Sequence, residues 1–209
     1  MLIKKVLLGV VLGFSFPTKA QVTEYGMSHT NIPKGLPVGS VVKNLVFTNQ
    51  LNEEISLNVA LEEGPVVITF YRGNWCPYCS RALAALSDSI SFITDAGATL
   101  IAISPESKDQ LLLTSEEVTL GINLVADNSG ELMRFFDVDF DVTTEYQEKL
   151  DRLGLPDLKE HNNQEHSVLP VPAVYVLDQK GKIVWRYFNY DYHERASIQS
   201  ILKAIKQAR

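Results

Sequence analysis

Both cysteines of this 209-residue chain stand in one short stretch, TFYRGNWCPYCSRAL, at residues 69–83. Cys76 and Cys79 are two residues apart, and thiols at this spacing can form a disulfide, bind a soft metal ion or lie buried as small apolar residues. A disulfide between such near neighbours closes a very small loop and constrains the unfolded chain little. A purely structural crosslink therefore explains the pair poorly.

Redox chemistry at this pair needs a setting that stabilises a thiolate, because a free cysteine has a pKa of about 8.5. The start of a helix is such a setting, and Pro77 favours the first position of a helix. Cys76 would then cap the helix and Cys79 would lie one turn inside, near unpaired backbone N–H groups and the positive end of the helix dipole. Arg72 could add a fixed positive charge. After one sulfur is attacked or oxidised, the other can close a disulfide.

Two other hypotheses compete with the redox pair. Free cysteines are often buried, so both could be ordinary core residues. Two thiolates also suit copper(I) or zinc, with His161 and His166 as the further ligands. These histidines fall in the polar stretch EHNNQEH, where solvent-exposed side chains are the more common arrangement.

The segments around the cysteines have the hydrophobic pattern of buried strands. Residues 66–71, 98–104 and 122–127 are rich in β-branched and apolar side chains on both faces. Helical patterns separate these runs. Strands that alternate with helices predict an α/β fold that contains a parallel sheet.

The helix that carries the cysteines is expected to run from Pro77 to a stop at Gly97. Ser104 and Pro105 resemble the cap and first position of the next helix. A final helix is expected from Glu194, with Asp191 and Glu194 forming a capping box. The helix from Pro77 and the helix from Glu194 would both present apolar side chains to the core. These are Leu83, Leu86, Ile90 and Ile93 on the former and Ile198, Leu202 and Ile205 on the latter.

Two hairpins and an acidic segment complete the pattern. Residues 44–57 predict two short strands around a turn, and residues 173–188 predict a clear hairpin around the turn QKGK. Residues 137–166 carry nine acidic against three basic side chains and are expected to form an inserted surface excursion. It begins with an edge strand in which Asp137, Asp139 and Asp141 share one face.

The first twenty residues have the layout of a secretory signal peptide, with Lys4 and Lys5 before an apolar run that leads to Ala20. That run is too short for a transmembrane helix. Removal of residues 1–20 would take away Lys4, Lys5 and Lys19 and change the formal net charge from −6 to −9. This negative charge disfavours nucleic acid and anionic lipid as partners. We expect residues 21–209 to form one domain, located in the periplasm.

The stretch FYRGNWCPYC, followed about ninety residues later by LPVPAVYVLDQKGKIVWRYFNYDYHER, resembles the thioredoxin fold. It is most similar to the peroxiredoxin-like branch of the alkyl hydroperoxide reductase and thiol-specific antioxidant (AhpC/TSA) superfamily, over roughly residues 35 to 207. The resemblance implies a central mixed sheet flanked by helices. It places Cys79 in the peroxidatic position.

The chain departs from the peroxiredoxin pattern at three positions. Cys76 stands where peroxiredoxins have threonine or serine, Arg72 stands where they have proline, and their usual arginine falls at Pro172. In thioredoxin-fold proteins a cis-proline faces the active disulfide, and Pro172 is the matching residue. Trp75, Val171 and Pro172 are therefore candidates for holding substrate, whereas the pattern assigns no role to Tyr192 or Arg195.

Our leading hypothesis is a thiol-dependent oxidoreductase that reduces hydroperoxides. Cys79 would become a sulfenic acid, Cys76 would close the disulfide, Arg72 would stabilise the thiolate, and a thioredoxin-type protein would restore both thiols. No metal, flavin or nicotinamide is implied, because the sulfurs carry the electrons. The alternatives are thiol–disulfide exchange with protein substrates, in which Cys76 attacks, and a copper-binding module.

Overall fold

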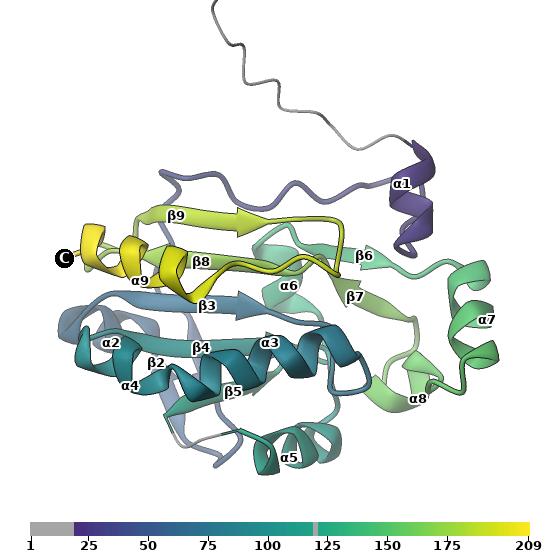
Figure 1. Ribbon diagram of the computed structural model, residues 1–209, viewed down its shortest axis with the longest axis horizontal. Helices are drawn as coiled ribbons and strands as arrows, with labels where there is room; N and C mark the ends of the chain where they lie inside the picture. Colours follow the sequence, from purple (N-terminus) through teal and green to yellow (C-terminus); the bar gives the residue numbers. More distant parts are fainter. Residues whose placement is uncertain (1–18, 119–120) are drawn as a thin grey trace, which may run out of the picture.

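The computed structural model describes residues 19–118 and 121–209 of the chain. A central five-stranded sheet runs through it with helices on both faces (Figure 1). The three strands on one side are parallel, and the last two are antiparallel to their neighbours. The strands, in spatial order, are β5 (Ile122–Ala126), β4 (Thr99–Ser104), β3 (Val66–Phe70), β8 (Ala173–Leu177) and β9 (Ile183–Phe188). The predicted mixed α/β architecture is confirmed.

One face of the sheet is covered by α3 (Pro77–Asp88), α4 (Ile90–Asp95) and α9 (Ile198–Gln207), which lie toward the viewer in Figure 1. As predicted, α3 begins at Pro77, and Cys76 occupies its N-cap. The predicted single helix is broken at Ser89, although the expected apolar face continues through both parts. Cys76 and Cys79 are buried in this core cluster, so the protein holds its two sulfurs between α3 and the sheet.

The opposite face of the sheet packs against α2 (Leu57–Glu63) and α6 (Glu131–Phe135). The N-terminal hairpin forms as predicted, with β1 (Val46–Thr48) antiparallel to β2 (Glu54–Ser56), and Ser56 also caps α2. Because β3 alternates its side chains between the two faces, Val67 belongs to one core and Ile68 to the other.

The acidic segment forms folded structure of its own. It contains β6 (Asp139–Asp141), α7 (Thr144–Arg152) and α8 (Leu158–Asn162), and β6 pairs antiparallel with β7 (Val168–Pro170). A third core cluster unites it with α1 (Lys19–Glu24), and its buried members include Tyr146, Leu150, Leu158 and Leu169. The segment is thus more than a surface excursion, because it brings Tyr146 to the cysteine region.

Two predicted helix starts are wrong. Ser104 is the last residue of β4, where it pairs with Ala126, and the following helix α5 (Lys108–Glu116) is capped by Ser107. The final helix starts at Ile198 with Ser197 as its cap, four residues after Glu194. Ser104 is held by strand pairing and Asp191 lies in a turn, so neither caps a helix. In each place a serine further along the chain is the N-cap.

The proposed signal peptide falls almost entirely on residues 1–18, outside the described residues, so its removal and the single domain at 21–209 stay predictions. Among the helices of the described chain, none combines the length and the apolar character needed to cross a membrane.

Candidate active site

The two cysteines lie at the N-terminus of α3 as separate thiols. Cys76 and Cys79 are both buried, and no disulfide joins them in this structure. Cys76 takes the extended N-cap conformation, and the backbone N–H groups of Cys79 and Ser80 both donate to its carbonyl. This geometry places both sulfurs in the first turn, at the positive end of the helix.

The two sulfurs share one charge. A hydrogen bond from Cys79 lowers the pKa of Cys76 to about 5, with Arg72 and the backbone N–H groups of Tyr78 and Cys79 acting in the same direction against burial. Burial raises the pKa of Cys79 well above its ordinary value, and the charge on Cys76 adds to this effect. At neutral pH the pair therefore holds one thiolate and one thiol, with Cys76 favoured as the resting site of the charge.

Arg72 supplies a buried positive charge beside the pair. Its side chain is 1% exposed, and its guanidinium lies over the rings of Tyr192, Trp75 and Tyr146 at 4.1, 5.0 and 5.3 Å. Nη2 donates to the Tyr146 hydroxyl at 2.7 Å, and the backbone N–H of Arg72 donates to Sγ of Cys79 at 3.4 Å.

No carboxylate pairs with Arg72 in the described part of the chain, and its Nε and Nη1 atoms have no hydrogen-bond partner there. A buried charge normally has a counter-charge. The thiolate of the cysteine pair is the negative group that faces Arg72. The arrangement agrees with the predicted role of Arg72 in stabilising a thiolate, which stays a prediction.

Arg195 is a second cation at the sulfur, and the sequence did not assign it a role. Its Nη2 atom lies 3.3 Å from Sγ of Cys79. Its Nη1 atom donates to the backbone carbonyls of Tyr192 and Glu194, which fixes the turn between β9 and α9. Arg195 thereby places a guanidinium at Sγ of Cys79, although Pro172 stands where the peroxiredoxin pattern has its arginine.

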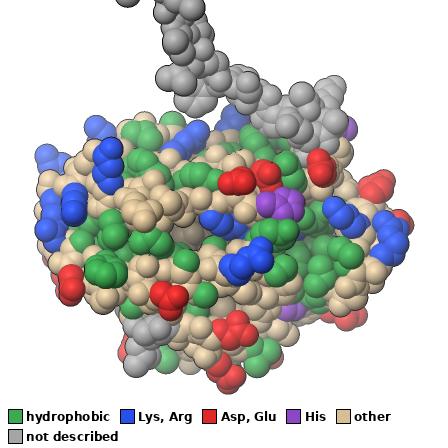
Figure 2. Space-filling view, in the orientation of Figure 1, with side chains coloured by type: hydrophobic (Ala, Val, Ile, Leu, Met, Phe, Trp, Pro, Cys, Tyr) green, Lys and Arg blue, Asp and Glu red, His purple; other side chains and the backbone are tan. Residues whose placement is uncertain are grey.

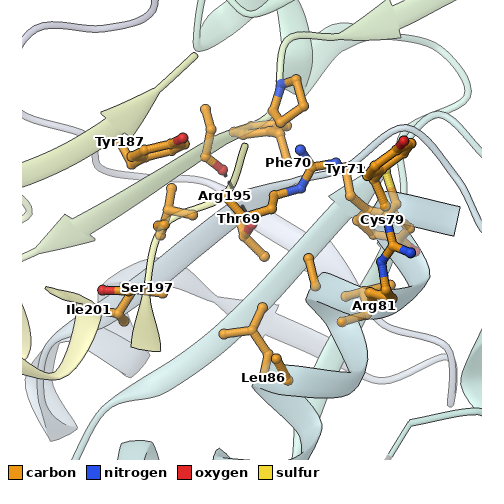
Figure 3. Close-up of a pocket in the computed structure, with 18 of the residues that line it drawn as sticks. Thr69, Phe70, Tyr71, Cys79, Arg81, Leu86, Tyr187, Arg195, Ser197 and Ile201 are labelled. Atoms are coloured by element: carbon orange, nitrogen blue, oxygen red, sulfur yellow. Dashed lines mark hydrogen bonds between the residues drawn. The ribbon is translucent and has the colours of Figure 1, made fainter. Parts of the chain in front are cut away.

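A cavity of about 400 Å³ opens onto Cys79, and Cys76 is absent from its lining. The cavity extends between α3 and the start of α9, with Cys79 on one side, Ser197 and Ile201 on the other and Arg195 between them (Figure 3). Hydrophobic side chains gather over this region of the surface, with Lys and Arg side chains among them (Figure 2). The apolar wall is formed by Ala82, Leu83, Ala85, Leu86, Val174, Ile198 and Ile201.

Pro172 lines this cavity together with Cys79, and its role in holding substrate stays a prediction. No cis peptide bond occurs in the described residues, so the expected cis-proline is absent and the Val171–Pro172 bond is trans, the form favoured by most X–Pro bonds. Val171 is fully buried in the third cluster, and its N–H donates to Val138. Trp75 packs on Arg72 and donates from Nε1 to its carbonyl at 3.2 Å.

Comparison with known proteins identifies the family. The model of the AhpC/TSA family matches residues 38–186, which is most of the chain and includes both cysteines. The chain belongs to the AhpC/TSA family.

Named relatives and solved structures agree with this membership. The chain is 25% identical over 168 residues to chloroplastic peroxiredoxin Q of Triticum aestivum, which covers 80% of this chain and 66% of the relative. It is 22% identical to chloroplastic peroxiredoxin Q of Populus jackii, covering 87% and 81%. The peroxidoxin BcpB structure from Mycobacterium tuberculosis superposes with a TM-score of 0.63 at 18% identity, covering 83% and 99%. The predicted thioredoxin fold and peroxiredoxin-like thiol oxidoreductase class are confirmed.

A buried carboxylate that the sequence analysis missed fixes the loop before the cysteines of this AhpC/TSA protein. Glu106 is fully buried, accepts the backbone N–H of Asn74 at 2.8 Å, and is also bonded by the hydroxyls of Ser104 and Thr114. Burial acts to raise the pKa of Glu106, and the nearby His161 ring together with the hydrogen bonds from Asn74 and Ser104 outweighs it, so the pKa is lowered. The sequence feature that could have indicated Glu106 is its position as a carboxylate just after the buried strand β4.

The histidines do not assemble a metal site with the cysteines. His161 was expected to be solvent-exposed, but its side chain is only 8% exposed. Its Nε2 atom lies 3.8 Å from Oε1 of Glu106. Within residues 19–118 and 121–209 no three His, Cys, Asp or Glu side chains gather as metal ligands would. The copper hypothesis therefore finds no ligand set there.

Proposed function

We propose that this AhpC/TSA protein is a peroxidase in which Cys79 attacks a hydroperoxide and Cys76 resolves the product. One observation carries the assignment: Cys79 is the sulfur that lines the cavity and contacts Arg195, whereas Cys76 caps the helix behind it. A peroxide in the cavity meets Cys79 first. The shared proton must then lie on Cys76, so that the charge is on Cys79 at the moment of attack.

In the first step, the Cys79 thiolate attacks the terminal oxygen of the hydroperoxide. The S–O bond forms and the O–O bond breaks, so sulfur loses two electrons and the alkoxide leaves with the electron pair. Arg195, at 3.3 Å from Sγ of Cys79, is placed to stabilise the thiolate and the charge that develops on oxygen. The products are Cys79 sulfenic acid and an alkoxide, which becomes an alcohol once it gains a proton.

In the second step, Cys76 attacks the sulfenic sulfur. The S–S bond forms, the S–O bond breaks, and hydroxide leaves as water with the proton of Cys76. Arg72 and the backbone N–H groups of Tyr78 and Cys79, which act to lower the pKa of Cys76, stay in place to stabilise its thiolate in this step. A dithiol protein of the thioredoxin type would then reduce the Cys76–Cys79 disulfide and become oxidised in turn.

The cavity favours organic hydroperoxides over hydrogen peroxide. Its walls are mainly aliphatic, and its volume of about 400 Å³ exceeds the needs of a molecule with two oxygen atoms. An alkyl or aryl substituent would displace water from this surface and position the O–O bond beside Cys79. We also propose that the protein acts in the periplasm after removal of residues 1–20, where this chemistry would protect exported molecules.

Thiol–disulfide exchange is the second candidate, and the low pKa of Cys76 favours it, because an exposed thiolate attacks protein disulfides. Two observations weigh against it. Cys76 is only 1% exposed, and the backbone groups of Val171 and Pro172 that would hold an extended substrate already bond to Val138 and Asn189.

Two assays on purified dithiol protein separate the candidates. We expect consumption of cumene hydroperoxide coupled to a thioredoxin-type donor, and formation of one intramolecular disulfide per peroxide. The Cys76→Thr variant removes the exchange nucleophile and supplies a hydroxyl in its place. It should still react once with peroxide and should not reduce insulin. Insulin reduction by this variant, or a wild-type protein that consumes no peroxide, would reject the proposal.

A further inference from the structure

The turn Asp191–Arg195 between β9 and α9 touches the cysteine helix at two points. Arg195 reaches Cys79, and the ring of His193 meets the edge of the Tyr78 ring with centroids 4.4 Å apart. His193 lines the same cavity as Cys79 and Arg195. This histidine lies in the stretch DYHER, residues 191–195. Of these residues, only Arg195 takes part in the reaction steps proposed above. A titratable ring therefore stands at the mouth of the cavity without an assigned role.

Asp191 and the neighbouring rings fix the orientation of His193. Oδ1 of Asp191 lies 2.6 Å from Nδ1 of His193 and also accepts the His193 backbone N–H at 2.9 Å. The imidazole stacks on Tyr192 with centroids 4.2 Å apart. Because Nδ1 is held by the carboxylate, Nε2 is left without a partner among the described residues. The side chain is 40% exposed, so solvent can supply the ring with protons.

We propose that His193, positioned by Asp191, is a catalytic residue that donates the Nε2 proton to the alkoxide released when Cys79 cleaves the O–O bond. The inference rests on the proposed peroxidase function. An alkoxide is a strongly basic leaving group, so a proton donor at the leaving oxygen lowers the barrier. Arg195 can offer charge there, but a guanidinium does not release its proton.

The step requires His193 to enter with a proton on both ring nitrogens and with Nδ1–H donated to the Asp191 carboxylate. As the Cys79 S–O bond forms and the O–O bond breaks, the Nε2 proton moves to the leaving oxygen and an alcohol departs. The imidazole is then neutral, with Nδ1–H still donated to Asp191, and it regains its Nε2 proton from solvent. No further oxidant or reductant is needed.

Charged and titratable side chains from three elements surround this ring. Asp191 is the carboxylate among them, and hydrogen bonds from His193 lower its pKa against the effect of partial burial. The groups that contact the ring or line the cavity beside it are Asp191, Tyr25, Tyr78, Tyr192, Arg81 and Arg195. A single adjacent carboxylate and two guanidinium groups make the site suitable for an anionic product.

The test compares leaving groups that do and do not need a proton. Cumene hydroperoxide releases a basic alkoxide, whereas peroxybenzoic acid, a substrate of similar size, releases a stable carboxylate. The rate of peroxide loss would be measured in a single turnover at pH 7 for wild type, His193→Gln and the control His29→Gln, which changes an exposed histidine that does not line the cavity.

We expect His193→Gln to lower the rate with cumene hydroperoxide by about 100-fold, the scale of general acid catalysis, and to leave the rate with peroxybenzoic acid little changed. Asp191→Asn should give a smaller loss with the same selectivity, and His29→Gln should match wild type. Equal losses with both peroxides, or no loss with either, would overturn the assignment of His193. A wild-type protein inert to both peroxides would instead reject the peroxidase function itself.

Discussion

Arg195 and Cys79 are 116 residues apart in the sequence, yet the Nη2 atom of Arg195 lies 3.3 Å from Sγ of Cys79. The contact joins the turn after β9 to the first turns of α3. It gives this AhpC/TSA protein a cation at the sulfur although Pro172 stands where the family pattern has its arginine. The same turn carries His193, so one short segment provides both the charge and the proton of the proposed reaction.

Replacing Arg195 tests this contact. Hydrogen bonds to charged groups contribute about 1.5–3 kcal/mol, so Arg195→Gln should slow oxidation of the dithiol by cumene hydroperoxide by roughly 10- to 100-fold. Arg195→Lys should recover part of the rate, because it keeps the charge. Arg152→Gln is the matched control, since that arginine lies exposed on α7 and pairs with Glu148. An unchanged rate in Arg195→Gln would mean that the contact does not assist attack.

The Tyr146 hydroxyl should stabilise the fold through Arg72. Tyr146→Phe removes the acceptor of the Nη2 bond and leaves a third nitrogen of the buried guanidinium unpartnered. The free energy of unfolding of the reduced protein, measured in urea, should fall by about 1–3 kcal/mol.

Tyr190→Phe is the control for this loss. Its hydroxyl donates to the neutral carbonyl of Pro33 at 2.7 Å, and the site is partly exposed, so the expected cost is about 1 kcal/mol or less. Equal effects of the two substitutions would show that the charge on Arg72 does not depend on Tyr146.

Thiolate absorbance should follow the shared charge. In the reduced protein, one thiolate should appear with a midpoint near pH 5, and the second should not appear below pH 9. Cys79→Ala removes the hydrogen bond that contributes most to the low pKa of Cys76, so the first midpoint should rise. Cys79→Ser keeps a hydrogen-bond donor, so in this variant the first midpoint should rise less. A wild-type protein without thiolate below pH 8 would contradict the arrangement.

Stability should change with pH for the same reason. The folded pKa of Cys76 is lowered from 9.0 to about 5, so its contribution is complete above the unfolded value and is lost as pH falls. The free energy of unfolding of the reduced protein should therefore rise between pH 5 and pH 9. The disulfide form lacks this titration and serves as the reference.

Local patterns predicted the parts of the fold that depend on local chemistry. The buried strands, the two hairpins and the start of α3 at Pro77 follow from hydrophobic alternation and from the preference of proline for the first helical position. The position of both sulfurs at that helix start was therefore accessible from the sequence.

Tertiary contacts decided the rest. Ser104 carries a cap signal, but its pairing with Ala126 extends β4 through it. Asp191 was expected to cap α9, and it instead bonds His193 within a turn. The contacts of Tyr146 with Arg72 and of Arg195 with Cys79 join segments 74 and 116 residues apart, and nothing local to these residues marks them as partners.

Identifying the sulfur that receives the peroxide oxygen tests the assignment of Cys79 as the attacking residue. Cys76→Thr and Cys79→Ser would each be treated with one equivalent of cumene hydroperoxide in the presence of a sulfenic-acid trap, and the adduct would be mapped by mass spectrometry. We expect an adduct on Cys79 in the first variant and at most a much slower reaction in the second. An adduct on Cys76 at wild-type rate in Cys79→Ser, with none in Cys76→Thr, would contradict this assignment.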